Sequence, residues 1–453
     1  MTIRALFAIT VGVLTAAAVL SGSVAAVTDA DRVRVYHDFR VVFDARQYEE
    51  ALPLAQALVS MTEEQYGGAD RGLVNPLSNL GTTQYRLQQL KAAEATFLRA
   101  VKIVEASGGD TDRALLRPLH GLGATYFASR QYEDASLILK RALDLSRNLD
   151  GLFNLEQMPI LDPLIESLVA LDRYDEAERA YDYSIRVAET AYGKADTHVL
   201  KALERAAHWQ ERMGRYTTAR ILYARALQIA ERAEGSGSIR TVGPLEGIAR
   251  TYRLQYVNDG DSGATQAKLV DAFEAASDLN SGDTNSQELN PDGERAILLA
   301  FKSIDKAQPV DHMRRGTALV ELGDWYMSAG ELPKGLQAYR RAWRDLEQGG
   351  STAELAAPRQ LAYRSPLSSV TRFKGDRDNM EEHYVEATFT VTNDARTTNV
   401  TVSDTDATES QQKVVLAAVR RAHYAPRFEN GEPADTQGVK LKERLLSRKP
   451  RSG

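Results

Sequence analysis

The stretch RQYEDASLILKRALDLSRNLDG, residues 130–151, decides the fold because its key positions recur along the chain at a fixed interval. One column of residues spaced 42 apart consists of Tyr48, Leu90, Tyr132, Tyr174 and Tyr216. Two further columns keep the same register: Ala51, Ala93, Ala135, Ala177 and Ala219, and Gly67, Gly109, Gly151, Gly193 and Gly235. Three columns of residues that recur in the same register indicate a repeated structural unit.

Each unit is expected to be a pair of helices. The second helix is marked by Tyr132, Ala135, Leu139 and Ala142, which have the spacing of one helical face. Gly151 then stands where the end of a helix needs a residue that tolerates positive φ. The first helix is marked by an earlier apolar face with counterparts in the other units: Leu119, Leu122, Gly123 and Tyr126. Small residues in the Gly123 and Ala135 columns let the two helices approach closely.

Helix pairs repeated every 20 to 50 residues are typical of a solenoid, in which no unit buries its apolar face alone. The order of Leu, Gly, Tyr and Ala positions resembles the tetratricopeptide repeat, and the longer period is similar to that of the kinesin light chain variety. The predicted fold is therefore mainly α. It is an α-solenoid of tetratricopeptide-like helix pairs, followed by a small α+β (ββαβ) domain described below.

The solenoid is predicted to cover residues 29–348, with an irregular insertion at about 255–293. Asn258 stands in a turn-rich string, VNDGDSG, where a Tyr or Leu is expected. Helices are expected at 265–279 and 294–306, separated by a polar loop. The repeat pattern then returns, with Leu319, Leu322, Gly323, Tyr326, Leu332, Gly335, Tyr339 and Ala342 each 200 residues after their equivalents in the third unit.

The C-terminal part changes from helical to alternating periodicity. Residues 349–377 contain Pro358 and Pro366 and are interpreted as a linker. Residues 378–446 then predict a small domain: a hairpin of two strands, an amphipathic helix at 409–421 and a last strand at 439–445. Residues 447–453 form a basic tail.

The stretch HYAPRFENGEPADTQGV, with Pro426, Gly431 and Pro433, resembles the C-terminal domain of TonB-type proteins. This resemblance implies a sheet with an open edge strand that can pair with an extended partner segment. The Pro-rich spacer of a TonB-type transducer is missing from the sequence, and so is the family's usual entry into the first strand.

The N-terminus carries one positive charge at Arg4, an apolar run from Ala5 to Leu20 and small residues ending at Ala26. We interpret residues 1–26 as a cleaved secretory signal peptide. The alternative is an uncleaved membrane anchor. Secretion across the inner membrane into the periplasm follows from the first interpretation, and a cysteine-free chain suits that oxidising compartment.

Composition excludes several classes of function. A net charge of −6 and a pI near 5.8 argue against nucleic-acid or anionic-membrane binding, so membrane contact is expected only through a partner. The absence of cysteine excludes disulfides, thiolate catalysis and cysteine zinc sites. No phosphate loop or hydrolase motif occurs in the sequence, so we expect no catalytic residue, no cofactor and no metal.

The resemblance to tetratricopeptide repeats implies a concave groove lined by the first helix of each pair. The candidate protein-binding residues on that groove are Ser78, Thr82, Tyr85, Arg117, His120, Phe127, Asp162, Glu166, Lys201, Glu204, His208, Glu211, Glu246, Arg250 and Arg253. Glu204, His208 and Glu211 share one helical face, and Glu166 lies in the His208 column of the preceding unit. They leave open a site for a divalent cation or for a basic peptide segment, as alternatives to a solvated groove face with mixed charge.

The predicted function is that of a non-catalytic periplasmic scaffold or adaptor, which binds proteins or peptides of the cell envelope through the concave face of its repeats. One alternative is an accessory of TonB-dependent transport that acts through the C-terminal domain. A second alternative is an unrecognised enzyme or metal-binding protein.

Overall fold

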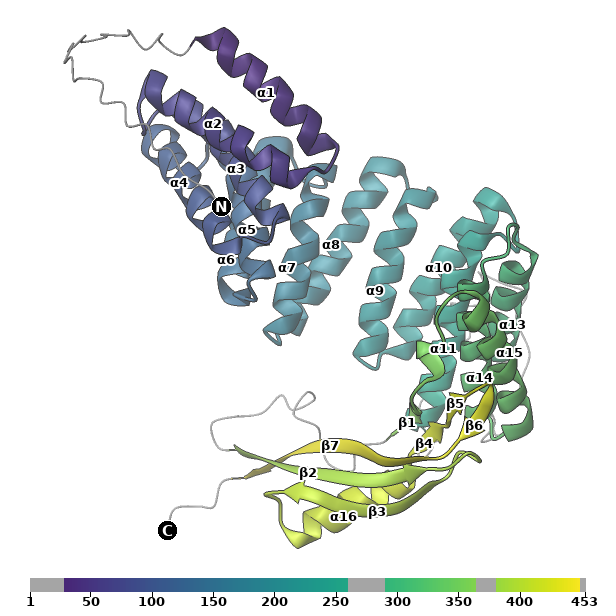
Figure 1. The fold of residues 1–453 in the computed structure, drawn as a ribbon. Helices are drawn as coiled ribbons and strands as arrows, with labels where there is room; N and C mark the ends of the chain where they lie inside the picture. The colour runs from purple at the N-terminus through teal and green to yellow at the C-terminus, as the bar shows by residue number, and fades with distance from the viewer. Residues whose placement is uncertain (1–27, 260–289, 364–379, 449–453) are drawn as a thin grey trace, which may run out of the picture. The chain divides into compact units, whose positions relative to one another are not determined.

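The computed structural model describes residues 28–259, 290–363 and 380–448, and Figure 1 shows their fold. The chain divides into two compact units, each of which is treated by itself. The first comprises residues 1–149 and 162–171, and the second comprises residues 150–161 and 172–453. The expected signal peptide, the expected helix at 265–279 and the end of the basic tail lie outside the described residues. Within the described ranges, no helix combines the length and the apolar character needed to cross a bilayer.

The repeat predicted from the three columns is confirmed. The second helix of each pair, called the B helix, has 19 residues and begins at the Tyr132 column: α2 (Tyr48–Tyr66), α4 (Leu90–Gly108), α6 (Tyr132–Asp150), α8 (Tyr174–Tyr192) and α10 (Tyr216–Glu234). The glycine column follows, with φ between 77° and 94°. This is the left-handed conformation that glycine adopts without a steric cost.

The first helices, called A helices, are equally regular. After α1 (Asp29–Asp44) come four helices of 13 residues: α3 (Val74–Arg86), α5 (Leu116–Ala128), α7 (Met158–Ala170) and α9 (Leu200–Arg212). A short 3₁₀ turn precedes each of the four. Asp70, Asp112, Asn154 and Asp196 cap these turns by accepting a hydrogen bond from the amide two residues later.

Small residues do let the helices of one pair approach closely. A Cβ atom added at Gly123 would lie 2.5 Å from Cγ of Leu139, and one added at Gly323 would lie 2.5 Å from the ring of Tyr339. The large side chain of the B helix therefore occupies the space that a side chain at the glycine would need. The glycine is thus required by packing.

The sixth pair departs from the regular pattern. Helix α11 (Val242–Asp259) continues into the stretch from residue 255 that we expected to be irregular. Gln255 accepts a hydrogen bond from Arg220 of α10 at 2.6 Å, which ties the end of α11 to the preceding helix. Helix α13 (Pro291–Lys306) packs on α11. The pattern then returns as expected with α14 (His312–Ser328) and α15 (Leu332–Gln348).

The C-terminal region contains a three-stranded antiparallel sheet in the order β3-β2-β7, formed by β2 (Met380–Val391), β3 (Thr397–Thr405) and β7 (Thr436–Arg448). Helix α16 (Glu409–Arg420) lies along one face of this sheet (Figure 1). Its Val415 and Val419 are buried with Val385 and Phe389 of β2. This arrangement is the predicted ββαβ order.

The segment expected as a linker carries structure of its own. Strand β1 (Arg359–Ala362) lies in this segment and pairs antiparallel with β4 (His423–Ala425). Further along the chain, β5 (Arg427–Glu429) and β6 (Glu432–Ala434) pair as a hairpin. Prolines and polar residues suggested a linker, but Leu361 is 4% exposed within the core that also holds α14 and α15. Burial of this one apolar residue fixes the segment to the helices.

The hairpin closes the end of the helix array. Phe428 of β5 packs edge-on against Tyr339 of α15 with ring centroids 5.6 Å apart. Arg340 of α15 pairs with Glu432 of β6 at 2.7 Å. Terminal pairs of a solenoid need such a covering because their outer apolar face has no further repeat to pack on. The hairpin and β1 provide this cover.

Candidate functional site

The candidate groove residues lie on the A helices, and we call the surface that they form within each compact unit the A-helix face. In the first unit several of them are engaged locally. The hydroxyls of Ser78 and Thr82 donate to carbonyls one turn earlier, at 2.6 and 2.7 Å, and Arg117 donates to Asn79 at 3.1 Å. The ring of Phe127 lies 6.0 Å from that of Tyr132. Partly buried positions of this unit are Tyr85, His120, Phe127, Asp162 and Glu166.

In the second unit the groove residues of α9 differ in depth. Lys201 and His208 are exposed, Glu204 is half-buried and Glu211 is buried. Both carboxylate oxygens of Glu211 accept hydrogen bonds from Arg250 of α11, at 2.6 and 3.0 Å. The hydroxyl of Tyr223 on α10 donates to the same carboxylate at 3.1 Å. Glu211, Arg250 and Tyr223 thus form a closed triad that joins three helices.

A second triad lies two helix pairs further on. Asp324 of α14 accepts hydrogen bonds from the Tyr339 hydroxyl at 2.7 Å and from Arg359 of β1 at 2.6 Å. Arg253 of α11 stands between the triads, with its Nη2 atom 4.0 Å from carboxylate oxygens of both Glu321 and Asp324. In the second compact unit, the A-helix face is therefore held together by charge pairs between successive repeats.

Register explains this pattern. Glu211 and Arg253 lie in the Phe127 column, whereas Arg250 lies in the column that begins at Ala124. Asp324 is 200 residues after Ala124, so it belongs to the same column as Arg250. Glu211, in the Phe127 column, pairs with Arg250, in the Ala124 column of the next repeat. Arg253, in the Phe127 column, pairs with Asp324, in the Ala124 column of the following repeat, so the signs of the two charges are exchanged.

Sequence reasoning missed Asp324, Glu321 and Arg359. The 200-residue offset that located Leu319 and Tyr339 would have placed Asp324 in the column of His208 and Arg250. The same offset puts Glu321 in the Gly121 column, which holds none of the candidate residues. For Arg359 the sequence held no signal, because its segment lacks the repeat. Its place depends on β1 pairing with β4, more than 60 residues later in the chain.

Three carboxylates of this face are not part of either triad. Burial raises the pKa of Glu204. Burial, reinforced by the neighbouring Glu321, raises the pKa of Glu246 to about 7. Burial and the charge of Asp324 raise the pKa of Glu321. Glu246 makes no hydrogen bond and no ion pair within the described residues. We call Glu204, Glu246 and Glu321 the acidic patch; the exposed Arg314 of α14 lies near its first two members.

The expected alternative of a metal site rests on Glu204, His208 and Glu211. In the structure the Glu211 carboxylate is taken up by Arg250 and Tyr223, and Nδ1 of His208 lies 3.9 Å from it. Within residues 28–259, 290–363 and 380–448, no group of three or more such side chains is placed to hold a metal ion.

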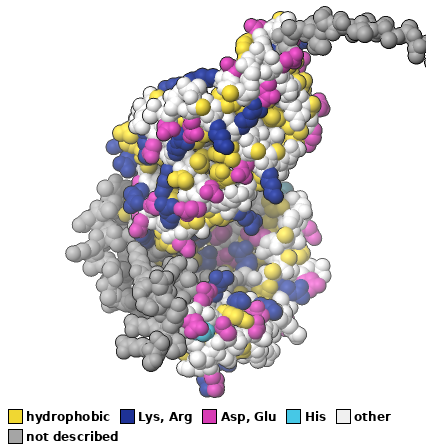
Figure 2. Space-filling model, turned by 90° about the vertical axis from the view of Figure 1, so that its left-hand side faces the viewer, with side chains coloured by type: hydrophobic (Ala, Val, Ile, Leu, Met, Phe, Trp, Pro, Cys, Tyr) yellow, Lys and Arg dark blue, Asp and Glu magenta, His cyan; other side chains and the backbone are white. Residues whose placement is uncertain are grey.

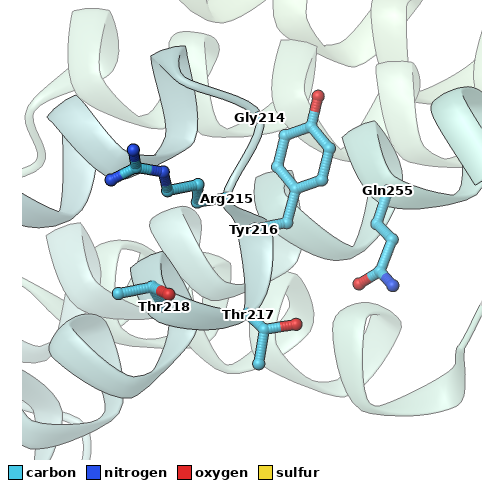
Figure 3. A pocket seen from close by; sticks show the side chains of 6 residues that line it. All are labelled: Gly214, Arg215, Tyr216, Thr217, Thr218 and Gln255. Atoms are coloured by element: carbon cyan, nitrogen blue, oxygen red, sulfur yellow. The ribbon is translucent and has the colours of Figure 1, made fainter. Parts of the chain in front are cut away.

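A shallow pocket of about 170 Å³ lies beside this region, where α10 begins and α11 ends. Figure 3 shows that the labelled side chains of Arg215, Tyr216 and Thr217 point in different directions. Arg215 is paired with Glu178, and Gln255 accepts from Arg220. The pocket therefore offers no convergent set of groups for a small ligand.

Surface charge is mixed. Lys and Arg side chains alternate with Asp and Glu over the face shown in Figure 2, and neither sign gathers into a large patch there. Such a surface gives no strong long-range attraction for a polyanion.

Residues 40–106 and 76–148 match the profile of the tetratricopeptide repeat family, so the chain contains tetratricopeptide repeats. The sequence matches none of the curated proteins. Solved structures with similar folds include the kinesin light chain TPR-like repeats of Podosopora anserina, at 14% identity and a TM-score of 0.41, covering 45% of this chain and 96% of that one.

Two further structures are similar. A tetratricopeptide repeat protein of Parabacteroides merdae is 15% identical with a TM-score of 0.40, covering 71% of this chain and 94% of that one. The TPR2AB domain of yeast Sti1, solved as a complex with pHSP90, is 16% identical with a TM-score of 0.26, covering 72% and 96%. The resemblance of residues 378–446 to the TonB C-terminal domain stays a prediction.

Proposed function

We propose that this tetratricopeptide repeat chain is a non-catalytic scaffold that binds a protein or peptide segment on its A-helix face. The observation that most supports this is that some charged residues of that face are paired with one another and others are not. Buried charges are locked in the two triads, while Glu246 of the acidic patch lacks any partner among the described residues. A rigid frame with unsatisfied groups at its surface is preorganised for binding.

The partner class follows from the shape and chemistry of the site. Among the described residues, no group of three or more His, Asp or Glu side chains is placed to hold a metal ion, and the pocket beside Gly214 is shallow. Within one compact unit, a row of polar side chains along successive A helices matches an extended segment, which can contact several repeats at once. Proteins with repeats of this type typically act as protein-interaction scaffolds.

The test is site-specific photo-crosslinking in living cells. A photo-reactive residue at Tyr85, Lys201 or His208 on the A-helix face should capture a defined partner. The same residue at Lys102 of α4 or Glu231 of α10, both exposed on B helices, is the matched control. Equal capture from both sets, or capture from the B helices alone, would contradict the proposal.

We also propose that the scaffold acts in the periplasm, because residues 1–26 have the pattern of a cleaved signal peptide. Cell fractionation and the N-terminal sequence of the mature chain test this. A mature N-terminus at Ala26 or Val27 in the periplasmic fraction is the expected result. A cytoplasmic chain that retains Met1 would refute it.

The sheet supports a second candidate function, as an accessory of TonB-dependent transport. Strand β7 has 13 residues and pairs with β2 alone among the described strands. Its other edge can accept an extended partner strand. A photo-reactive residue at Lys440 should then crosslink to an outer-membrane receptor. Crosslinks that come only from the A-helix face would favour the scaffold.

A further inference from the structure

The A-helix face of α14 is covered by the chain itself. Its four face positions lie 200 residues after those of the third unit and hold Thr317, Val320, Asp324 and Met327. The last three of these side chains are buried. At matching positions of α9, by contrast, Lys201 and His208 are exposed. The segment that covers α14 is residues 353–361, which we call the strap.

The strap makes complementary polar contacts with α14. It comprises the 3₁₀ turn η6 (Ala353–Leu355) and most of β1. Its Glu354 accepts a hydrogen bond from the hydroxyl of Thr317 at 3.0 Å. Its Arg359 donates to both carboxylate oxygens of Asp324. Nη1 of Arg359 also lies 3.3 Å from Glu354, so the two charged groups of the strap are paired with each other.

The strap is also held through an apolar side chain and through its backbone. Leu361 is buried in the core to which Val320 and Met327 of α14 belong. Strand β4 pairs with the backbone of β1, and the hydroxyl of Tyr424 on β4 donates to the side chain of Gln360 at 3.0 Å. Strand addition combined with contacts to particular side chains is a common mode of peptide recognition. The strap is therefore bound as a peptide ligand would be.

Two glycines join the strap to α15. Gly349 follows the last residue of the helix, and Gly350 has a φ of 94°. A Cβ atom added at Gly350 would have no atom of the described residues within 4 Å, so packing does not require this glycine. Glycine has the widest conformational freedom of any residue. The connection to α15 therefore constrains the strap only weakly.

We propose that α14 and β4 form a binding site for an extended segment with the pattern Glu-Leu-x-x-x-Arg-Gln-Leu. The strap fills this site in the free chain, and a partner segment with the same pattern takes its place. The Asp324 carboxylate selects the arginine, the Thr317 hydroxyl selects the acceptor, and the core selects the leucines. This inference rests on the proposed function and adds the chemistry of the partner.

The test uses the full chain and a fluorescein-labelled peptide with the sequence of residues 351–363, Ser-Thr-Ala-Glu-Leu-Ala-Ala-Pro-Arg-Gln-Leu-Ala-Tyr. The double variant Arg359→Gln, Leu361→Ala weakens the chain's own strap. By fluorescence anisotropy, this variant should bind the peptide at least about tenfold more tightly than the parent chain, in which the strap competes. Arg340→Gln, which breaks an exposed ion pair of α15 and leaves the strap intact, should bind like the parent.

A second peptide, with Gln and Ala in place of the arginine and the last leucine, tests the pattern. It should bind the double variant at least about tenfold more weakly than the first peptide. Circular dichroism checks that the double variant keeps its helices. If it unfolds, Leu361→Ala alone, which retains the arginine, replaces it and should still bind the first peptide more tightly than the parent does.

Equal affinity of the parent and the strap variant, or of the two peptides, would overturn the inference. A parent chain that sediments as a dimer and is dissociated by the peptide would assign the site to the strap of a second copy. Failure of the inference is distinguishable from failure of the proposed function. If His208 captures a partner in cells but the peptide does not bind, the scaffold stands and only the α14 site is wrong. If the peptide binds but no A-helix position captures a partner, the reverse holds.

Discussion

Arg359 of β1 donates hydrogen bonds to both carboxylate oxygens of Asp324 on α14, at 2.6 and 3.2 Å. The Asp324 side chain is 3% exposed, and Tyr339 of α15 donates to it as well. A four-residue strand is thus tied to the last helix pair through one buried charge. The same strand pairs with β4, so this contact joins the helices to the C-terminal sheet region.

Replacement of Arg359 should therefore be costly. Arg359→Gln removes the only arginine that donates hydrogen bonds to Asp324 among the described residues, leaving Arg253 as its more distant counter-charge at 4.0 Å. Breaking a buried ion pair costs about 3 to 5 kcal/mol. The free energy of unfolding in urea measures the loss. Arg340→Gln is the matched control, because it breaks the exposed pair with Glu432 in the same region. Similar losses in the two variants would contradict the assignment.

The hairpin cover predicts a local effect. Phe428→Ala removes a ring that is 2% exposed and packs on Tyr339. Large-to-small changes of this kind cost about 3 to 5 kcal/mol. Hydrogen exchange should accelerate in α15. Val419→Ala, in the separate core under the sheet, should instead loosen α16 and β2. Unchanged exchange of α15 in the Phe428 variant would show that the hairpin does not cover the array.

The periodic part of the fold could be predicted closely because each helix boundary depends on local chemistry. In the first five pairs the Tyr132 column marks the first residue of the B helix, and the Gly151 column marks the residue that follows its end. These signals lie within one unit and repeat, so each occurrence supports the others. The same register placed α14 and α15, after the interrupted sixth pair.

The rest depends on contacts between distant residues. The pairing of β1 with β4 joins segments more than 60 residues apart, and no periodicity marks either. In the site, the sequence indicated which residues share the A-helix face, but it did not indicate which of them form ion pairs with one another. Glu211 and Glu246 occupy similar faces of α9 and α11. Only the structure shows that Arg250 neutralises the first and leaves the second unpaired.

The glycine columns predict a coupling between two helices. Gly123→Ala would bring a Cβ atom 2.5 Å from Cγ of Leu139, and such overpacking costs about 1 to 3 kcal/mol. Leu139→Val should recover part of that cost, so the double-mutant cycle should give a coupling energy of at least about 0.5 kcal/mol. Gly109→Ala is the control. Its φ is 77° with no neighbour within 4 Å, so its effect should add independently to that of Leu139→Val. A zero coupling for Gly123 would contradict the packing account.

The acidic patch predicts a dependence of stability on pH. Burial and Glu321 raise the pKa of Glu246 to about 7 from an ordinary value of 4.5, opposed by Arg314 of α14 and Arg250 of its own helix. Because the folded state holds this proton more tightly than the unfolded chain, the group stabilises the fold fully below about pH 4.5. That contribution is lost as pH rises through 7.

Glu246→Gln should therefore be more stable than the parent chain at pH 8, by about 1 to 2 kcal/mol once solvent screening of this half-buried group is allowed for. The difference should shrink steadily between pH 7 and 4.5, because the parent carboxyl becomes protonated in both states. Urea denaturation of both chains at several pH values measures it. Glu231→Gln, at an exposed site of α10, should show no such trend. If Glu246→Gln is instead less stable at pH 8, the carboxylate has a stabilising partner, and the patch is not an unsatisfied acidic site.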